Sequence, residues 1–181
     1  LTKTLLVSIS EYGRKIYEKS TFIKKCELIG LRMFHSWNLW NKNMFHLEFP
    51  NISHKSRYLD MIEEWKNFEK PDSPWALFRG ENFEEFLEIT EKNKETNSLG
   101  VPATLFFFME DADILWALQL RHHIDHPNLS MEWWAGGHIG YWLHPSARGK
   151  WLATEMLSLG LEEARKLWLE KVLISAFEDN P

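Results

Sequence analysis

Two basic residues flank a glycine in the segment Arg148-Gly149-Lys150, directly before a run of residues that favours a helix. A Pro-Ser loop precedes this segment, and His138 to Leu143 has the pattern of a short strand. The first turn of a helix has N–H groups without intrahelical partners, and its peptide dipoles place roughly half a positive charge there. Because Gly149 has no side chain, backbone N–H groups can approach an anion closely. These residues together predict a site for a ligand with more than one phosphate group.

The longer segment Gly136-Gly-His-Ile-Gly-Tyr-x-Leu-His-Pro-Ser-Ala-Arg-Gly-Lys-x-Leu-Ala-Thr-Glu-Met156 resembles the acetyl-coenzyme A motif of the GCN5-related N-acetyltransferase (GNAT) family. The family pattern is Arg/Gln-x-x-Gly-x-Gly/Ala between a strand and a helix, and its backbone amides cradle the pyrophosphate of the coenzyme. Arg148 takes the first position of the pattern, Trp151 the fourth and Ala153 the sixth. The fourth position should be glycine, so Trp151 departs from the family. The resemblance covers about residues 45–181, and its specific part is 114–180.

The resemblance implies that the coenzyme contacts the strand, the loop and the helix start. The main chain of Trp142 and Leu143 would bind the pantetheine arm, and the hydroxyl group of Thr154 could donate to a phosphate. Asn180 would touch the coenzyme arm or orient a following helix; the alternative is a simple helix cap ahead of Pro181. The expected coenzyme-binding residues are Trp142, Leu143, Arg148, Gly149, Lys150, Trp151, Leu152, Ala153, Thr154 and Asn180.

Tryptophan is unusually frequent, with 10 residues among 181. A large indole at position 151 should obstruct a pyrophosphate group. Trp116, Trp142 and Trp168 also stand where we expect similar sequences to have glycine. We therefore hypothesise that some of these positions are UGA codons that the source reads as glycine. The alternative is a diverged, tryptophan-rich member of the family.

The resemblance also implies the chemistry, in which an acceptor amine attacks the acetyl thioester directly and a backbone N–H stabilises the oxyanion. An amine is protonated near neutral pH, so a base must remove its proton. His138 is one candidate catalytic residue, because the pKa of histidine lies near working pH. Arg121 and His122 end the preceding strand and could lie beside it. Glu178 is the second candidate, with Asp179 as its rival; solvated side chains are the alternative for all of them.

We expect no metal. His122, His123, Asp125, His126 and His138 could suggest a metal site, but adjacent histidines on a strand point to opposite faces. Cys26 is the single cysteine, which excludes an intrachain disulfide and a cysteine-rich zinc site and indicates a reducing compartment.

The elements that must position these residues follow from the hydrophobic pattern. Strands are predicted over 44–49, 103–109, 114–122, 138–143 and 171–176, and the second and third form a hairpin. Helices are predicted over about 53–68 with a Ser53 cap, over 83–93 with an Asn82 cap, and from the basic turn to about 167. The last helix would turn one face to the sheet, namely Ala153, Met156, Leu157, Gly160, Leu161, Ala164 and Trp168.

A strand, a helix and a strand in this order predict a right-handed parallel crossover. The fold class is therefore α/β (α+β), a GNAT-type mixed central sheet flanked by helices, and the family's final helix and two strands are missing. Residues 43–181 would form this C-terminally truncated domain. Residues 1–42 would be an N-terminal extension, either native or upstream of a true start at Met33 or Met44, with a helix-compatible stretch over 11–25.

The leading hypothesis is an N-acetyltransferase that transfers an acetyl group from acetyl-CoA, its co-substrate, to a primary amine of a small molecule or peptide. A non-catalytic, degenerate acyl-CoA-binding or interaction domain is the alternative, and an O-acyl acceptor is a third option. A net charge of −5 gives no support for nonspecific nucleic-acid binding. The apolar run over 5–9 is too short to span a bilayer, so we expect a cytoplasmic protein without membrane contact. A homodimer is compatible with the resemblance.

Overall fold

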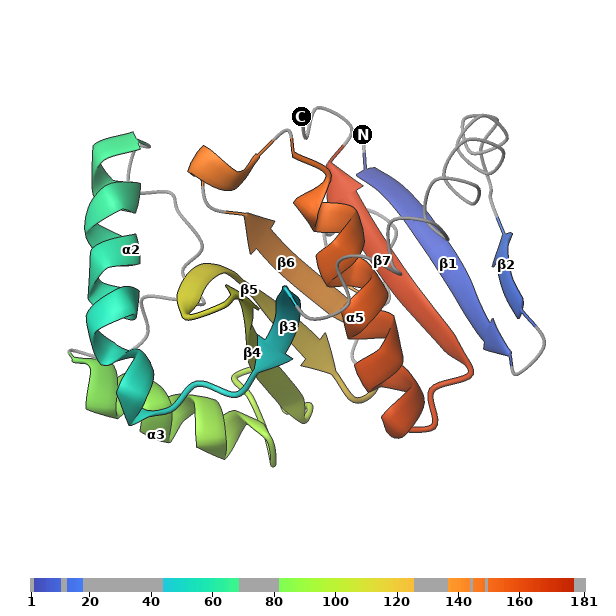
Figure 1. The fold of residues 1–181 in the computed structure, drawn as a ribbon. Helices are drawn as coiled ribbons and strands as arrows, with labels where there is room; N and C mark the ends of the chain where they lie inside the picture. The colour runs from blue at the N-terminus through green and yellow to red at the C-terminus, as the bar shows by residue number, and fades with distance from the viewer. Residues whose placement is uncertain are drawn as a thin grey trace.

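The computed structural model describes residues 2–10, 13–17, 44–68, 82–125, 137–143, 145–148 and 150–177. Its strands are β1 (Thr2–Ser10), β2 (Gly13–Tyr17), β3 (Phe45–Glu48), β4 (Ala103–Glu110), β5 (Asp113–Arg121), β6 (Ile139–Leu143) and β7 (Lys171–Phe177). They form one sheet in the order β2-β1-β7-β6-β5-β4-β3 (Figure 1). Neighbouring strands run antiparallel except β6 and β7, which are parallel. The predicted mixed sheet with flanking helices is confirmed.

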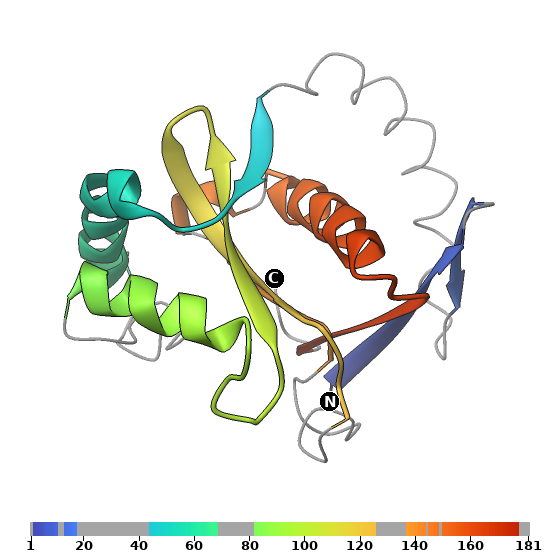
Figure 2. The same ribbon diagram turned by 90° about the horizontal axis from the view of Figure 1, so that it is seen from below.

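Helices lie on both faces of the sheet. Figure 2 shows α2 (Lys55–Phe68) and α3 (Phe83–Asn93) on one side of β4 and β5, and α5 (Leu152–Lys166) on the other. The predicted cap of α3 is confirmed, because the side chain of Asn82 accepts a hydrogen bond from the Glu85 N–H at 2.9 Å. In the described residues no helix is long and apolar enough to cross a membrane.

The start of α2 differs from the prediction of a Ser53 cap. A short 3₁₀ turn, η2 (Ile52–His54), precedes α2, and Asn51 caps it. The Asn51 Oδ1 accepts from both the N–H and the hydroxyl of Ser53, at 2.9 and 2.6 Å. The Asn51 N–H in turn donates to His54 Nδ1 at 3.1 Å. Ser53 is thus the donor and not the cap, because the asparagine amide oxygen two residues earlier reaches the free N–H groups first.

Two apolar layers hold the helices on the sheet. Under α2 and α3, the rings of Tyr58, Phe83 and Phe86 lie against one another and against Phe107, with ring centroids 4.8–6.1 Å apart. Under α5, a Cβ built on Gly160 would lie 2.6 Å from Leu118 Cδ1, so a larger residue at 160 would require the Leu118 side chain to move. These contacts hold β5 between the helices on its two faces.

The buried face of α5 was only partly predicted. Met156, Gly160 and Ala164 are buried as expected, but Trp168 is 90% exposed. The helix ends at Lys166 and the chain then turns with a φ of 60° at Trp168, so this residue leaves the helical face. The parallel strand–helix–strand arrangement of β6, α5 and β7 is confirmed; a further 3₁₀ turn, η4 (Pro145–Ala147), lies between β6 and α5.

The N-terminal strands extend the sheet beyond β7. β1 pairs along β7 from Thr2 opposite Phe177 to Ser8 opposite Lys171, and β2 pairs with β1. The helix-compatible interpretation of 11–25 is wrong over Gly13–Tyr17, where pairing with β1 determines a strand. The rest of that stretch lies outside the described residues. The division of the chain at residue 42 stays a prediction.

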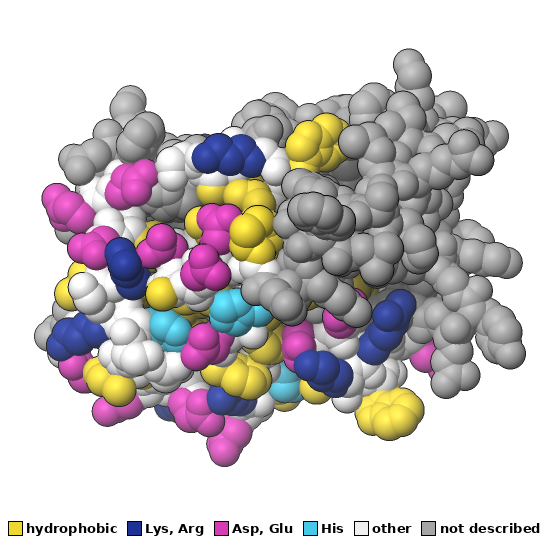
Figure 3. Space-filling model, viewed as in Figure 1, with side chains coloured by type: hydrophobic (Ala, Val, Ile, Leu, Met, Phe, Trp, Pro, Cys, Tyr) yellow, Lys and Arg dark blue, Asp and Glu magenta, His cyan; other side chains and the backbone are white. Residues whose placement is uncertain are grey.

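The charges on the surface are mixed. Figure 3 shows Asp and Glu side chains spread over the face that carries α2 and α3, with single Lys and Arg side chains between them. Ion pairs such as Lys55–Glu84 and Arg57–Asp113 connect neighbouring elements there. This distribution fits the net charge of −5.

Candidate functional site

β6 and β7 are paired only at one end. Ile139 stands opposite Ile174, Gly137 bridges to the same residue, and the His138 N–H donates to the Leu173 C=O at 2.8 Å. Beyond Ile139 no further pairing of the described residues joins the two strands, and they diverge toward their carboxyl ends (Figure 1). Beyond Ile139 one edge of β6 therefore has no strand partner among the described residues, and we call it the unpaired edge of β6.

The register with β5 decides which main-chain groups lie along this unpaired edge. The Arg121 N–H donates to the His138 C=O at 2.7 Å, so this carbonyl points toward β5, whereas the His138 N–H points toward β7. From Ile139 onward successive residues turn their main-chain groups alternately to the two sides of the strand. Gly140 and Trp142 therefore turn theirs toward β5, and Tyr141 and Leu143 toward the unpaired edge. The coenzyme contacts expected for the main chain of Trp142 and Leu143 stay predictions.

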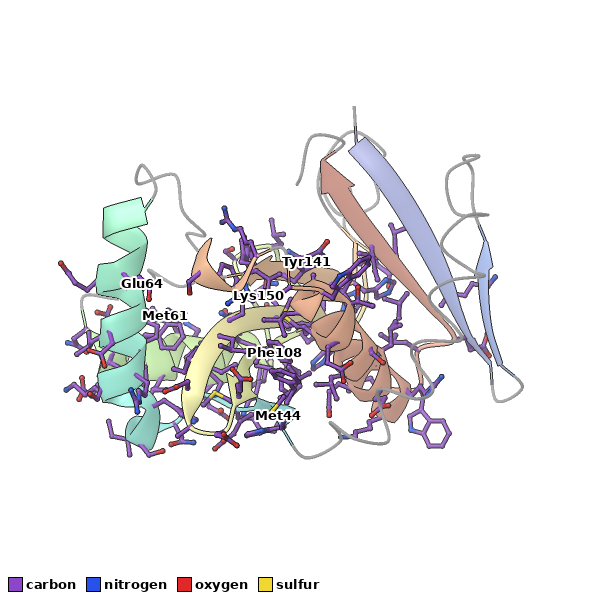
Figure 4. The ribbon with its side chains drawn as sticks, turned by 45° about the horizontal axis from the view of Figure 1, so that its top comes forward. Met44, Met61, Glu64, Phe108, Tyr141 and Lys150 are labelled. Atoms are coloured by element: carbon purple, nitrogen blue, oxygen red, sulfur yellow. The ribbon has the colours of Figure 1, made fainter. Side chains whose placement is uncertain are left out.

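The N-terminus of α5 lies near the unpaired edge of β6. Figure 1 shows α5 beginning in front of the diverging ends of β6 and β7, and Figure 4 labels Tyr141 on β6 and Lys150 just before the helix. No side chain caps the helix at Trp151. The Thr154 N–H donates to the Trp151 C=O at 3.1 Å, which leaves the N–H groups of Leu152 and Ala153 among those without an intrahelical partner.

Two cations stand beside these amides. Arg148 and Lys150 are both exposed. The Arg148 Nε donates to the Leu143 C=O at 3.2 Å, which connects the loop to the end of β6. The helix dipole and the two side chains add positive potential at one place. The arrangement can bind an anion at α5 and an extended, amide-bearing chain along β6.

Trp151 occupies this position with a backbone that favours glycine. Its φ is 64° and its ψ is 5°, the left-handed conformation, which costs an L-residue roughly 1–2 kcal/mol. A strained conformation of this kind persists when surrounding structure imposes it. The Trp151 side chain is 78% exposed, so packing of the indole does not impose it. The course of the chain into α5 requires the conformation, and glycine would adopt it without strain.

Trp168 repeats this feature at the other end of α5. Its φ is 60°, the Leu169 N–H donates to the Ala164 C=O, and the Trp168 N–H donates to the Arg165 C=O. These two bonds define a Schellman motif, whose left-handed position is usually glycine. The other two suspected tryptophans lie in strands, where the backbone does not discriminate: Trp116 is fully buried and Trp142 is half-buried.

His138 is held as a hydrogen-bond acceptor at one ring nitrogen. The Leu173 N–H, which can only donate, lies 3.0 Å from His138 Nδ1, so the neutral ring carries its proton on Nε2. Burial lowers the pKa of His138, and the charge of Arg121 lowers it further, against the opposing charge of Asp125. A neutral ring with Nδ1 occupied and Nε2 protonated has no free lone pair. This geometry suits His138 to donate a hydrogen bond and not to act as the base that the sequence suggested.

Arg121 lies beside His138 with few partners. Its Nη1 donates to the Gly137 C=O at 2.9 Å, and its Nη2 lies 3.4 Å from Gln119 Oε1. Its Nε is buried and has no hydrogen-bond partner. Burial lowers the pKa of Arg121. Arg121 was expected near the site but without a role. A lone arginine at the end of an apolar strand is nevertheless a signal of a functional residue.

The neighbouring histidines do not converge on one point. The Nε2 of His122 lies 2.9 Å from the hydroxyl of Thr104, whereas Nδ1 of His123 lies 3.5 Å from a carboxylate oxygen of Asp125. Burial, and then the charge of His123, lower the pKa of His122. Within the described ranges no three His, Cys, Asp or Glu side chains are grouped as a metal site would need.

The remaining expected site residues divide into two groups. Gly149, Glu178, Asp179 and Asn180, and also His126, lie outside the described residues, so their roles stay predictions. Tyr141 was not among the expected site residues, although the period of two along a strand gives it the same orientation as Leu143. Thr154 is exposed one turn into α5, where its hydroxyl can still reach an anion at the helix start.

Few known proteins are similar to this chain. No protein-family model matches the chain, and no curated protein matches it. Among solved structures the chain is similar to the microcin C7 self-immunity acetyltransferase MccE, which was crystallised in complex with acetyl-CoA and AMP. The identity is 21% and the TM-score 0.45, over 67% of this chain and 62% of that one. At this identity and TM-score the likeness carries no function over to this chain.

Proposed function

We propose that the chain binds acetyl-CoA along the unpaired edge of β6 and transfers the acetyl group to a primary amine. The observation that carries the proposal is the uncapped N-terminus of α5, with Arg148 and Lys150 beside it, at the unpaired edge of β6. A helix N-terminus favours a phosphate, and an unpaired strand edge favours an extended chain with amide groups. Acetyl-CoA has both, and the sequence motif resembles the family that uses it.

The coenzyme would lie along β6. Its pyrophosphate would accept hydrogen bonds from the N–H groups of Leu152 and Ala153, with the charges of Arg148 and Lys150 nearby. The pantetheine amides would pair with the main chain of Tyr141 and with the N–H of Leu143 as an added strand would, since the Leu143 C=O accepts from Arg148. Gly149, Thr154 and Asn180 remain proposed contacts on the strength of the motif.

The reaction that this arrangement supports is direct transfer. The amine nitrogen forms a bond to the thioester carbonyl carbon, the carbon–sulfur bond breaks, and the products are an amide and the thiol of coenzyme A. A main-chain N–H on the unpaired edge of β6 would stabilise the oxyanion. The amine must lose a proton, and the thiolate must gain one. Glu178 and Asp179 remain the candidate bases, since the hydrogen bonds of His138 suit it to donate.

Trp151 favours the alternative function in the chain as it stands. A bulky residue in the left-handed conformation at the N-cap lies at the place where the pyrophosphate would bind. If tryptophan is the residue of the functional protein, a non-catalytic interaction domain is the better interpretation. We infer that glycine at position 151, and at 168, is the functional form, because the backbone there requires what glycine supplies.

Calorimetric titration with acetyl-CoA tests the proposal. The Trp151→Gly chain should bind at least about tenfold more tightly than the parent chain, a difference of about 1.4 kcal/mol. Trp168→Gly is the matched control, since it changes the same residue in the same conformation at the far end of the 15-residue helix, about 22 Å away. Binding by none of the chains would leave the interaction domain as the better proposal.

A second pair of variants tests the anion site itself. In the Trp151→Gly background, Arg148→Ala with Lys150→Ala should weaken binding by about tenfold or more, since hydrogen bonds to charged groups are worth about 1.5–3 kcal/mol each. Arg165→Ala with Lys166→Ala removes two exposed cations from the other end of α5 and serves as the control. Equal losses in both pairs would indicate only a general effect of charge.

A further inference from the structure

The guanidinium group of Arg121 is a half-buried cation whose partners among the described residues are neutral. Its Nη1 donates to a main-chain carbonyl, its Nη2 meets an amide oxygen at 3.4 Å, and its Nε has no partner. Among the described residues no carboxylate forms an ion pair with it. Asp125, whose charge reaches the neighbouring His138, lies 3.5 Å from His123 and is 89% exposed. A charge removed from water in this way is usually paired.

The position of this cation is defined by the sheet. Leu118 and Ile139 lie under α5, near Gly160. Because side chains alternate between the faces of a strand, Arg121 lies on the opposite face, as does Gly140. A Cβ built on Gly140 would lie 3.8 and 3.9 Å from Nη1 and Nη2 of Arg121. The guanidinium therefore lies over β6, one residue away from Tyr141.

The free donors of Arg121 have the geometry that a carboxylate requires. The Nε–H and the N–H of Nη2 on the same edge form a planar fork, which can bind both oxygens of a carboxylate. The contact of Nη2 with Gln119 is long, and the Gln119 side chain is half-buried, so an entering carboxylate oxygen can replace it.

We infer that Arg121 binds the carboxylate of the acceptor, and that the acceptor is an α-amino acid. The inference rests on the proposed function, in which the pantetheine amides lie along Leu143 and Tyr141 and the thioester follows toward Ile139. Strand residues rise about 3.3–3.4 Å each, so a carboxylate held over Gly140 lies about one residue away from the thioester. In an α-amino acid the amine and the carboxylate share one carbon. The amine can then attack the acetyl carbon, and the products are an N-acetyl amino acid and the thiol of coenzyme A.

Matched acceptor pairs test the inference. Lysine and cadaverine, histidine and histamine, and phenylalanine and phenethylamine differ only in the carboxylate. In the Trp151→Gly chain we expect a higher kcat/KM for each amino acid, by about tenfold or more, because a charged hydrogen bond is lost with the decarboxylated amine. Arg121→Met should remove this preference and leave the affinity for acetyl-CoA unchanged, and Arg121→Lys should keep part of it. Equal kcat/KM within the pairs would overturn the inference.

Two controls keep the result interpretable. Arg57→Met makes the same substitution at an exposed arginine of α2 and should leave the preference intact. The melting temperature of each variant shows whether the chain is folded. A preference that survives in a folded Arg121→Met chain would also overturn the inference.

A binding measurement separates this inference from the proposed function. The ¹⁵N and ¹H shifts of the Arg121 Nε–H group can be followed by NMR while lysine or cadaverine is added without acetyl-CoA. Saturable shifts with lysine and none with cadaverine would support the carboxylate site even if no acetyl transfer is found. Absent shifts with lysine would overturn it, whether or not acetyl-CoA binds.

Discussion

Four tryptophans that look alike in the sequence occupy two different kinds of place. Trp151 and Trp168 lie just outside the two ends of α5, are 78% and 90% exposed, and have left-handed backbones. Trp116 is fully buried in the inner strand β5, and Trp142 is half-buried in β6. Backbone conformation does not distinguish recoded from genuine tryptophan in the two strands, because both tryptophan and glycine can adopt the φ and ψ of a strand. The ends of a helix do discriminate, since a left-handed residue there favours glycine.

The two ends of α5 differ in turn from each other. At Trp168 the turn closes on itself, because the N–H groups of Trp168 and Leu169 are bonded to the last carbonyls of the helix. At Trp151 no side chain caps the helix, and amides remain for a ligand. The same backbone conformation therefore occurs in two settings. At Trp168 the main-chain groups bond to one another, whereas at Trp151 main-chain N–H groups at the start of the helix have no intrahelical partner.

The largest expected effect is at Trp116. Trp116→Gly should lower the free energy of unfolding by at least about 3–5 kcal/mol, the usual loss when a large buried aromatic residue is truncated. Chemical denaturation followed by circular dichroism measures it. Trp142→Gly should cost less, because that side chain is half-buried. A Trp116→Gly chain as stable as the parent would break the comparison and place Trp116 with the recoded positions.

The next effect concerns ligand binding and divides the two left-handed tryptophans. Trp151→Gly should tighten acetyl-CoA binding by about 1.4 kcal/mol or more, and Trp168→Gly should not change it. This difference should be seen by calorimetry at constant salt, since the anion site contains exposed cations that salt screens. Equal affinities in all three chains would show that the indole at 151 does not obstruct the site.

The smallest effect is on stability: the difference in unfolding free energy between alanine and glycine variants should change sign with position. At positions 151 and 168 glycine should be more stabilising than alanine by about 1 kcal/mol, because alanine still resists a positive φ. At the exposed helical position Glu162 alanine should be better than glycine by about the same amount. Urea denaturation of the six variants measures both differences. If alanine is better than glycine at all three positions, the left-handed conformations are wrong.

Glycine at 151 and 168 can also be sought directly. We expect peptide masses of the protein from its source cell to contain glycine at both positions. Tryptophan at both would support a diverged chain and the interaction domain.

Much of the fold was predictable because its signals are local. The Asn82 cap of α3, the hairpin of β4 and β5, and the order of β6, α5 and β7 all follow from residues that lie close together in the sequence. The proposed anion site could be named for the same reason, since Arg148, Lys150 and the start of α5 are neighbours in the chain, and it stays a prediction. The cap of α2 was misplaced by two residues, because Asn51 competes with Ser53 for the same N–H groups.

By itself the sequence determined the local elements and the segment that can bind phosphate, because helix and strand periodicity and chain neighbours are written in it. Only the tertiary structure decided the rest. The pairing of β1 with β7, the divergence of β6 from β7 and the orientation of Tyr141 depend on strand register between distant segments. The hydrogen bond to His138 Nδ1 and the burial of Arg121 likewise arise only when separate strands are brought side by side.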